Sequence, residues 1–138
     1  MERKILLASH GELAKGMVDS AKMIIGVFDY PVETFCLLPG HHPDEFKNSI
    51  ENEIVNNEDT EYIIVTDLYG ASVTTSLYQL TKYKNVKMFC GMNLNLVLSI
   101  LVEYKDKLSE EDIKQIVNDS QCGVKCLTNN ISFDENEF

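Results

Sequence analysis

Short apolar runs alternate with amphipathic stretches along most of the chain. The runs at residues 5–8, 32–38, 62–66 and 86–90 have the length of buried β-strands, and a turn or polar residue closes each of them. Between the runs, apolar residues recur every three or four positions, as they do in helices that bury one side. The pattern predicts an α/β fold, a doubly wound sheet of four parallel strands with helices on both faces.

Several residues mark where the predicted helices begin and end. Gly26 stops the first helix, and Pro43 suits the first turn of the second, because a missing backbone N–H is harmless there. Ser109 and Asp112 have the spacing of a capping box and begin the last helix. Gly123 ends that helix.

The C-terminal part of the chain has a weaker pattern. Residues 124–127 predict a short fifth strand, and residues 129–138 are polar and acidic, so we expect this tail to fray. No internal repeat or linker interrupts the chain. Residues 1–128 are therefore predicted to form one domain.

Composition and charge narrow the class of protein. The 138 residues are 44% hydrophobic and 25% charged, as in a globular domain. The formal net charge of −10 argues against nucleic acid, whose phosphates need clustered Lys and Arg, and against docking on anionic lipid. The apolar run near the N-terminus is too short for a signal peptide or a membrane span, so we expect a cytoplasmic protein.

The four cysteines do not indicate a disulfide framework or a zinc site. Cys36 and Cys90 lie inside apolar runs and are expected to behave as small buried hydrophobic residues. Cys122 and Cys126 are separated by three residues and have no second pair nearby, which is poor spacing for zinc. Reduced thiols, as in the cytosol, are the simplest interpretation.

Two chemically active residues follow strands that a doubly wound sheet places side by side. His10 follows the first strand and Asp67 the third, and such sheets carry their sites at the carboxyl ends of the strands. A carboxylate that accepts a hydrogen bond from one imidazole nitrogen leaves the other nitrogen as a nucleophile. The alternative is a solvated loop histidine and a turn aspartate, which position alone leaves open.

Other residues at the same edge of the predicted sheet are candidate ligands for an anion held on His10. Gly11 leaves room for such a group to approach the backbone. The turn after the third strand offers N–H and hydroxyl donors at Gly70, Ala71, Ser72 and Thr74. Ser72, like Asn93 after the fourth strand, suits a helix N-cap equally well.

His41 and His42 follow the second strand at this edge. Together with His10 and Asp67 they are chemically sufficient for zinc, but adjacent residues on a turn usually point apart. We therefore expect solvated turn residues, with neither metal nor cofactor bound.

Five short motifs, in this order and spacing, resemble the mannose-type IIA domain of the bacterial phosphoenolpyruvate-dependent sugar phosphotransferase system. They are Ile-Leu-Leu-Ala-Ser-His-Gly at residues 5–11, Pro-Gly at 39–40, Val-Thr-Asp-Leu-Tyr-Gly-Ala-Ser at 65–72, Gly-Met-Asn-Leu at 91–94 and Gly-Val-Lys-Cys-Leu at 123–127. The resemblance covers nearly the whole chain, from residue 5 to residue 127.

The resemblance implies a phosphocarrier. The histidine matching His10 accepts a phosphoryl group from the carrier HPr and passes it to a IIB protein, which phosphorylates sugar at the membrane permease IICD. The aspartate matching Asp67 pairs with that histidine. The family also forms homodimers that exchange the C-terminal strand, which implies an antiparallel, exchanged strand at about residues 123–127.

The chain departs from the family pattern in two loops. The family turn reads Asp-x-x-Gly-Gly-Ser-Pro-x-Asn, and this chain has Ala71, Val73 and Thr75 in place of the second Gly, the Pro and the Asn. The family's later Asn-x-Pro motif has Asn95 in place of the Pro. These changes leave the sugar and the IIB partner open. They also admit a regulatory relative that binds the relay partners without carrying sugar flux.

Two other α/β classes fit the chemistry less well. A signalling receiver domain needs an acidic pair after its first strand, where this chain has Ser9 and His10. A flavin-binding module needs a hydroxyl-rich phosphate loop there, which Gly11, Glu12 and Leu13 do not provide.

Overall fold

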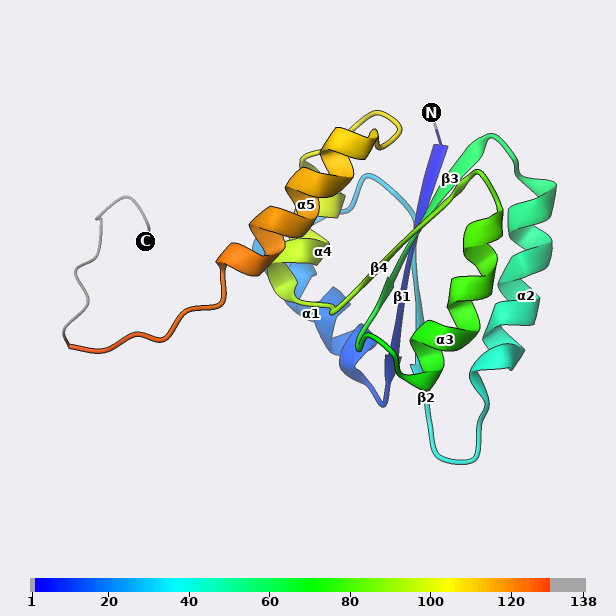
Figure 1. Cartoon of the computed structure of the whole chain (residues 1–138), viewed down its shortest axis with the longest axis horizontal. Coiled ribbons are helices and arrows are strands. Elements are labelled where there is room, and N and C mark those ends of the chain that lie inside the picture. Colours follow the sequence, from blue (N-terminus) through cyan, green and yellow to red (C-terminus); the bar gives the residue numbers. More distant parts are fainter. Residues whose placement is uncertain (1, 130–138) are drawn as a thin grey trace.

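A computed structural model describes residues 2–129 and contains the predicted parallel sheet. Its strands are β1 (Glu2–His10), β2 (Val32–Leu37), β3 (Thr60–Thr66) and β4 (Val86–Cys90). All three pairings are parallel and the order is β2-β1-β3-β4 (Figure 1). The order reverses direction between β1 and β3, and such a switch point is where doubly wound sheets bind ligands.

Five α-helices cover the two faces of the sheet. They are α1 (Leu13–Ile25), α2 (Pro43–Asn56), α3 (Ser72–Tyr78), α4 (Leu94–Val102) and α5 (Glu110–Cys122), and a 3₁₀ turn, Gln79–Lys82, follows α3. Helices α2 and α3 lie on one face, and α1, α4 and α5 lie on the other (Figure 1). The predicted three-layer arrangement is confirmed.

The central strands are continuous apolar runs because both of their faces are buried. On β1, Ile5 and Leu7 pack in the core beneath α1 and α4, whereas Leu6 and Ala8 pack beneath α2 and α3. Successive side chains of a strand point to opposite faces, so one run supplies both cores.

Two strands begin earlier than the apolar runs predict. The predicted strands start at residues 5 and 62, but β1 begins at Glu2 and β3 at Thr60. Arg3 and Glu61 are register partners on the two strands, and both are buried. Their charges interrupt the apolar pattern, and their mutual pairing is what permits their burial.

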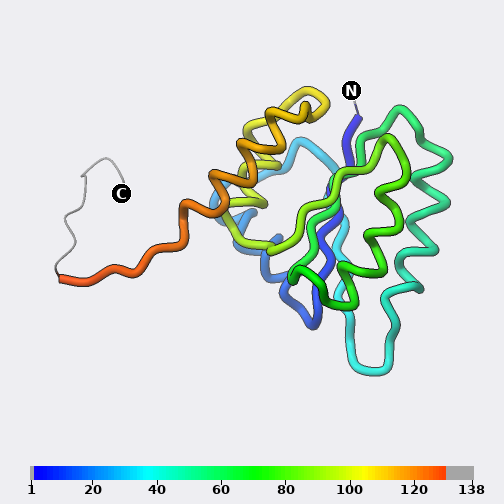
Figure 2. Tube along the Cα trace, in the orientation of Figure 1, coloured from blue at the N-terminus to red at the C-terminus, as the bar shows by residue number. Residues whose placement is uncertain are grey.

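The two ends of α5 differ from each other in how well they match the sequence prediction. The capping box is confirmed, since Ser109 Oγ accepts from the Asp112 N–H and Asp112 Oδ2 accepts from the Ser109 N–H. The predicted fifth strand is not formed in the single chain, where residues 124–127 carry no strand and lead away from the domain (Figure 2). A terminal strand needs a neighbouring strand, and this segment meets none. Residues 130–138, most of the predicted tail, lie outside the described residues.

Cys90 corrects a further expectation. Its side chain is exposed rather than buried, because it ends β4 at the edge of the sheet, while Cys36 on β2 is partly buried. All four cysteines are free thiols. Within residues 2–129, no helix is long and apolar enough to cross a membrane.

Candidate active site

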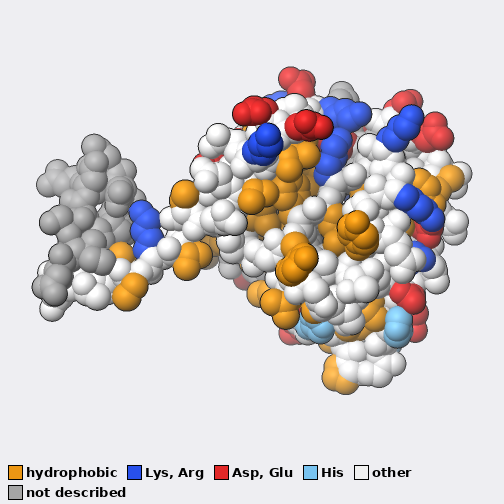
Figure 3. All heavy atoms as spheres, in the orientation of Figure 1, with side chains coloured by type: hydrophobic (Ala, Val, Ile, Leu, Met, Phe, Trp, Pro, Cys, Tyr) orange, Lys and Arg blue, Asp and Glu red, His pale blue; other side chains and the backbone are white. Residues whose placement is uncertain are grey.

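The carboxyl ends of β1 and β3 bring His10 and Asp67 together, as predicted. His10 is the last residue of β1, and Asp67 directly follows β3, the neighbour of β1 at the centre of the sheet. Histidine side chains emerge at this end of the molecule, with acidic side chains beside them (Figure 3).

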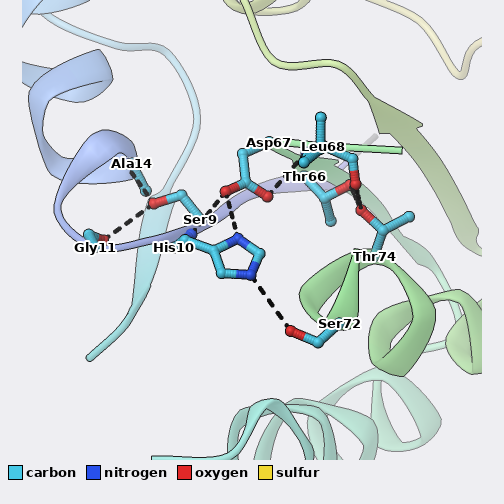
Figure 4. Close-up of polar contacts among 9 residues, drawn as sticks. All are labelled: Ser9, His10, Gly11, Ala14, Thr66, Asp67, Leu68, Ser72 and Thr74. Carbon is cyan, nitrogen blue, oxygen red and sulfur yellow. Dashed lines mark hydrogen bonds and ion pairs between the residues drawn. The ribbon is translucent and has the colours of Figure 1, made fainter. Parts of the chain in front are cut away.

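The Asp67 carboxylate is held by three hydrogen bonds. Its Oδ2 accepts from the backbone N–H of His10 at 2.7 Å and lies 2.8 Å from His10 Nδ1, while its Oδ1 accepts from the Leu68 N–H at 2.9 Å (Figure 4). Burial of the carboxyl opposes its ionisation, but the hydrogen bonds and the nearby imidazole outweigh burial and lower the pKa of Asp67. Asp67 is therefore a carboxylate at neutral pH.

This carboxylate determines the tautomer of His10. A carboxylate only accepts hydrogen bonds, so Nδ1 carries the ring proton of a neutral imidazole. The lone pair is then on Nε2, which lies 3.3 Å from Ser72 Oγ. The His10 side chain is 46% exposed and that of Asp67 only 11%, so the imidazole reaches solvent while its carboxylate partner is sheltered.

The turn after β1 is fixed by Gly11 and Ser9. Gly11 has a φ of +56°, in the left-handed region where a side chain is strained, and its N–H donates to the Leu37 carbonyl at 2.8 Å. The buried Ser9 hydroxyl accepts from the Ala14 N–H at 2.8 Å and donates to the Gly11 carbonyl. Ser9 thus satisfies an N–H in the first turn of α1 and holds the turn that contains His10.

The turn after β3 directs Ser72 toward His10. Gly70 has a φ of +79°, Ala71 is the N-cap of α3, and Ser72 is the first helical residue. Ser72 therefore does not cap α3, and its hydroxyl contacts His10 Nε2 instead (Figure 4). The backbone N–H groups of Ser72 and Val73, in the first turn of α3, have no hydrogen-bond acceptor among residues 2–129.

Comparison with known proteins shows which protein family this chain matches. The family model described as PTS system fructose IIA component, EIIA-man, matches residues 4–117. The chain belongs to the mannose-type IIA family of the sugar phosphotransferase system.

Two relatives agree with this assignment. The chain is 28% identical to the PTS system sorbose-specific EIIA component of Klebsiella pneumoniae over 86% of its own length and 88% of the relative. Its structure matches that of the PTS IIA protein associated with the fucose utilization operon of Streptococcus pneumoniae with a TM-score of 0.76 and 29% identity, covering 91% of this chain and 93% of the other.

A more distant structure supports the fold of this IIA protein. It is the mannose/sorbose-specific IIA subunit of Enterococcus faecalis, with a TM-score of 0.75 and 18% identity over 96% of this chain and all of the other. The four-stranded parallel sheet with five helices is therefore the architecture of solved IIA proteins.

Asn93 was a predicted site residue of this IIA protein, and His41 and His42 were expected to be solvated turn residues; all three have partners within the fold. Asn93 Oδ1 accepts from the Leu96 N–H as the N-cap of α4, and its Nδ2 donates to the Ser120 carbonyl, so its contact with a phosphoryl group stays a prediction. His42 Nδ1 accepts from the Asp44 N–H and caps α2, and His41 Nδ1 lies 3.7 Å from Glu45 Oε2. In the described part of the chain, no group of three or more His, Cys, Asp or Glu is placed to hold a metal ion.

The sequence did not predict the hydrogen bonds that Ser9 and Thr74 make beside the site. Ser9 lies five positions before the N–H that it satisfies, which is not the spacing of an N-cap rule. Thr74 was a candidate donor to the phosphoryl group, but its hydroxyl is bonded to Thr66 and to the Leu68 carbonyl (Figure 4). Neither contact leaves a signal in the spacing of residues.

Proposed function

We propose that this IIA protein is a phosphocarrier that takes a phosphoryl group on His10 Nε2 from phospho-HPr and donates it to a IIB component for sugar uptake. The contact between Asp67 Oδ2 and His10 Nδ1, 2.8 Å long, is the observation that carries the proposal. It leaves a single unprotonated nitrogen in a half-exposed ring, which is the form needed for attack on phosphorus.

The proposed step is an in-line transfer between two histidines. The Nε2 lone pair forms the new N–P bond while the N–P bond of the phosphohistidine donor breaks, and that electron pair returns to the donor ring. Positive charge grows on the His10 imidazole as the bond forms. The Asp67 carboxylate, already hydrogen-bonded to Nδ1, stabilises this charge without moving.

Donors at the start of α3 support the transferring group. The Ser72 hydroxyl, 3.3 Å from Nε2, is in reach of a phosphoryl group on that nitrogen. The unpaired N–H groups of Ser72 and Val73 supply further donors, and Gly70 and Ala71 shape the turn that presents them. Transfer between two histidines requires positioning above all, so we propose no metal or nucleotide in this step.

The surface near His10 favours docking of a protein partner. Leu13, Leu68 and Tyr69, which are close to His10 or Asp67 in sequence, are exposed apolar residues. Of these, tyrosine is a residue type that is enriched at protein interfaces. We propose that HPr and IIB use this surface in turn on the cytoplasmic side of the membrane, and that the IICD permease is reached only through IIB.

Intact mass measurement tests the proposal. The full chain is incubated with phosphoenolpyruvate, enzyme I and HPr, beside His10→Ala and the control His41→Ala. We expect one acid-labile phosphoryl group on the native chain and on His41→Ala, and none on His10→Ala. A folded native chain that stays unmodified while a known IIA protein is phosphorylated in the same mixture would contradict the proposal.

We further propose that the chain forms a homodimer by exchanging residues 124–127. Strand β4 is an edge strand, and hydrophobic side chains gather over it between α5 and α3 (Figure 3). Val124 and Leu127 are exposed in the single chain. We expect the full chain to sediment as a dimer and a chain ending at Gly123 as a monomer; equal masses would contradict strand exchange.

A further inference from the structure

Two threonine hydroxyl groups lie beside the Asp67 turn and contact each other rather than His10 (Figure 4). Thr66 is the last residue of β3 and is fully buried, and Thr74, in the first turn of α3, is 7% exposed. Their Oγ1 atoms are 2.7 Å apart. Neither hydroxyl takes part in the transfer step proposed above.

The direction of these hydrogen bonds follows from the number of protons. Thr74 Oγ1 lies 2.6 Å from the Leu68 carbonyl oxygen, which can only accept, so the single Thr74 hydroxyl proton is donated there. Thr66 must then donate its own proton to Thr74 Oγ1. The result is a directed relay from Thr66 through Thr74 to the Leu68 carbonyl, in which each bond polarises the next.

The relay ends on the residue that holds the Asp67 carboxylate. The Leu68 N–H donates to Asp67 Oδ1 at 2.9 Å. The Leu68 carbonyl accepts a short bond from Thr74 at 2.6 Å and a longer one from the Ala71 N–H at 3.3 Å, so both backbone groups of Leu68 are bonded. With Oδ1 held by Leu68, Oδ2 is the oxygen that faces the backbone N–H and Nδ1 of His10. The Leu68 N–H and the His10 N–H therefore set the rotation of the carboxylate together.

We propose that Thr74, with Thr66 behind it, is a positioning residue for phosphotransfer, because the hydroxyl relay holds Leu68 and thereby aims Asp67 Oδ2 at His10 Nδ1. The effect on transfer rate rests on the proposed function. The effect on the His10 tautomer does not, since it follows from the geometry of the unmodified protein.

Two substitutions at residue 74 and one control separate positioning from stability. Thr74→Val removes the hydroxyl at nearly constant shape, and Thr74→Ser keeps it. Thr81→Val is the matched control, because the Thr81 hydroxyl also donates to a backbone carbonyl, that of Tyr78 at 2.7 Å, on the 3₁₀ turn. For each full-length variant, ¹⁵N NMR of the His10 ring gives the tautomer, a rapid-mixing assay with phospho-HPr gives the rate, and thermal unfolding gives the stability.

We expect Thr74→Val to mix the two His10 tautomers and to slow phosphoryl uptake between about 10-fold and 100-fold, the scale of a misplaced catalytic contact. Thr74→Ser and Thr81→Val should keep the native tautomer and rate. A native tautomer in Thr74→Val, with only a lower unfolding temperature, would overturn the proposal.

Two further comparisons cover the cases in which Thr74→Val does not fold or the native chain takes no phosphoryl group. If Thr74→Val does not fold, Thr66→Val removes only the first donor of the relay and is held to the same two outcomes. If the native chain takes no phosphoryl group from phospho-HPr, the proposed function fails, while the tautomer comparison still decides whether the relay positions Asp67.

Discussion

Strands β1 and β3 carry two acid–base pairs, one at each end of the sheet. At the amino end, Arg3 and Glu61 are 2.8 Å apart, with side chains 0% and 3% exposed. At the carboxyl end, His10 and Asp67 are also 2.8 Å apart, but the His10 side chain is 46% exposed. The two contacts have the same length and involve the same two strands, so their surroundings decide what each pair does.

Both side chains of the amino-end pair make further hydrogen bonds to the surrounding protein. Glu61 also accepts from Lys87 Nζ and from the Leu108 N–H, and Arg3 donates to the carbonyls of Tyr104 and Asp106. These bonds tie the segment between α4 and α5 to the sheet. The His10 ring, in contrast, keeps one nitrogen free of the pair. The amino-end pair thus links parts of the fold through several bonds, whereas the carboxyl-end pair leaves the nitrogen that the proposed transfer needs.

The largest expected effect comes from neutralising the exposed pair. In Asp67→Asn, the tautomer of His10 is no longer fixed and no negative charge faces the growing imidazolium. We expect phosphoryl uptake from phospho-HPr to slow by about 10²-fold or more, since one preorganised electrostatic contact is typically worth about 10² to 10³ in rate. Rapid-mixing mass spectrometry measures the rate, and circular dichroism checks that the fold is retained. A rate close to the native one would remove Asp67 from the mechanism.

Removing the negative charge of the buried pair should lower the stability of the fold and leave phosphorylation unchanged. Glu61→Gln leaves Arg3 and Lys87 without their counter-charge, so we expect urea unfolding to show a loss of about 3 kcal/mol, as for a broken buried pair. Phosphorylation of the folded fraction should be unchanged. The control is Glu33→Gln, which breaks a more exposed pair with Lys4 and should lose less than about 1 kcal/mol. Equal losses in the two variants would show that burial does not distinguish these pairs.

Acid titration distinguishes the Asp67 and Glu61 carboxylates, because different hydrogen bonds lower the pKa of each. Burial opposes ionisation of Glu61, but hydrogen bonds from Lys87, Leu108 and Arg3 outweigh it, so its pKa, like that of Asp67, is lowered. A lowered folded pKa means that the unfolded chain binds more protons in acid. Each carboxylate therefore contributes stability above its ordinary pKa near 4, and loses it as the pH falls through the folded pKa.

The measurement is a ¹³C NMR titration of the two carboxyl carbons. In His10→Ala, the midpoint of Asp67 should rise because the ring contact is lost, while that of Glu61 should not move. The rise should be incomplete, because the backbone N–H groups of residue 10 and Leu68 still donate to Asp67. An unchanged Asp67 midpoint would mean that these N–H groups alone lower its pKa.

The same comparison shows what the sequence could predict. The pairing of His10 with Asp67 was predictable, because strand–helix alternation places the ends of the first and third strands together. The pairing of Arg3 with Glu61 was not, because charged residues interrupt the apolar runs by which strands are recognised. Its existence depends on strand register and on a distant segment near Leu108.

Hydrogen bonds between hydroxyl groups that follow no known sequence spacing could not be predicted from the sequence either. The capping box at Ser109 was predictable because both of its bonds are local and follow a known spacing. The Thr66–Thr74 relay depends on how the Asp67 turn folds back on α3. The fifth strand stays a prediction for another reason, since residues 124–127 have no neighbouring strand in a single chain.

The smallest expected effect compares two serines that satisfy helix N-termini at opposite ends of the sheet. Ser9 accepts from the Ala14 N–H in α1, and Ser109 accepts from the Asp112 N–H in α5. Replacing either serine by alanine should lower the free energy of unfolding by about 1 kcal/mol. Chemical denaturation of both variants checks this.

Their effects on phosphoryl uptake should nevertheless differ. Ser9 also donates to the Gly11 carbonyl and so holds the turn next to His10, whereas Ser109 lies at the start of α5, beside the loop that Glu61 holds. We expect Ser9→Ala alone to slow uptake, by a few-fold on the scale of a slightly loosened contact. Equal slowing in both variants would trace the effect to stability, and no slowing in Ser9→Ala would reduce Ser9 to a helix cap. Slowing confined to Ser9→Ala would extend the contrast between the two ends of the sheet from charged pairs to hydroxyl groups.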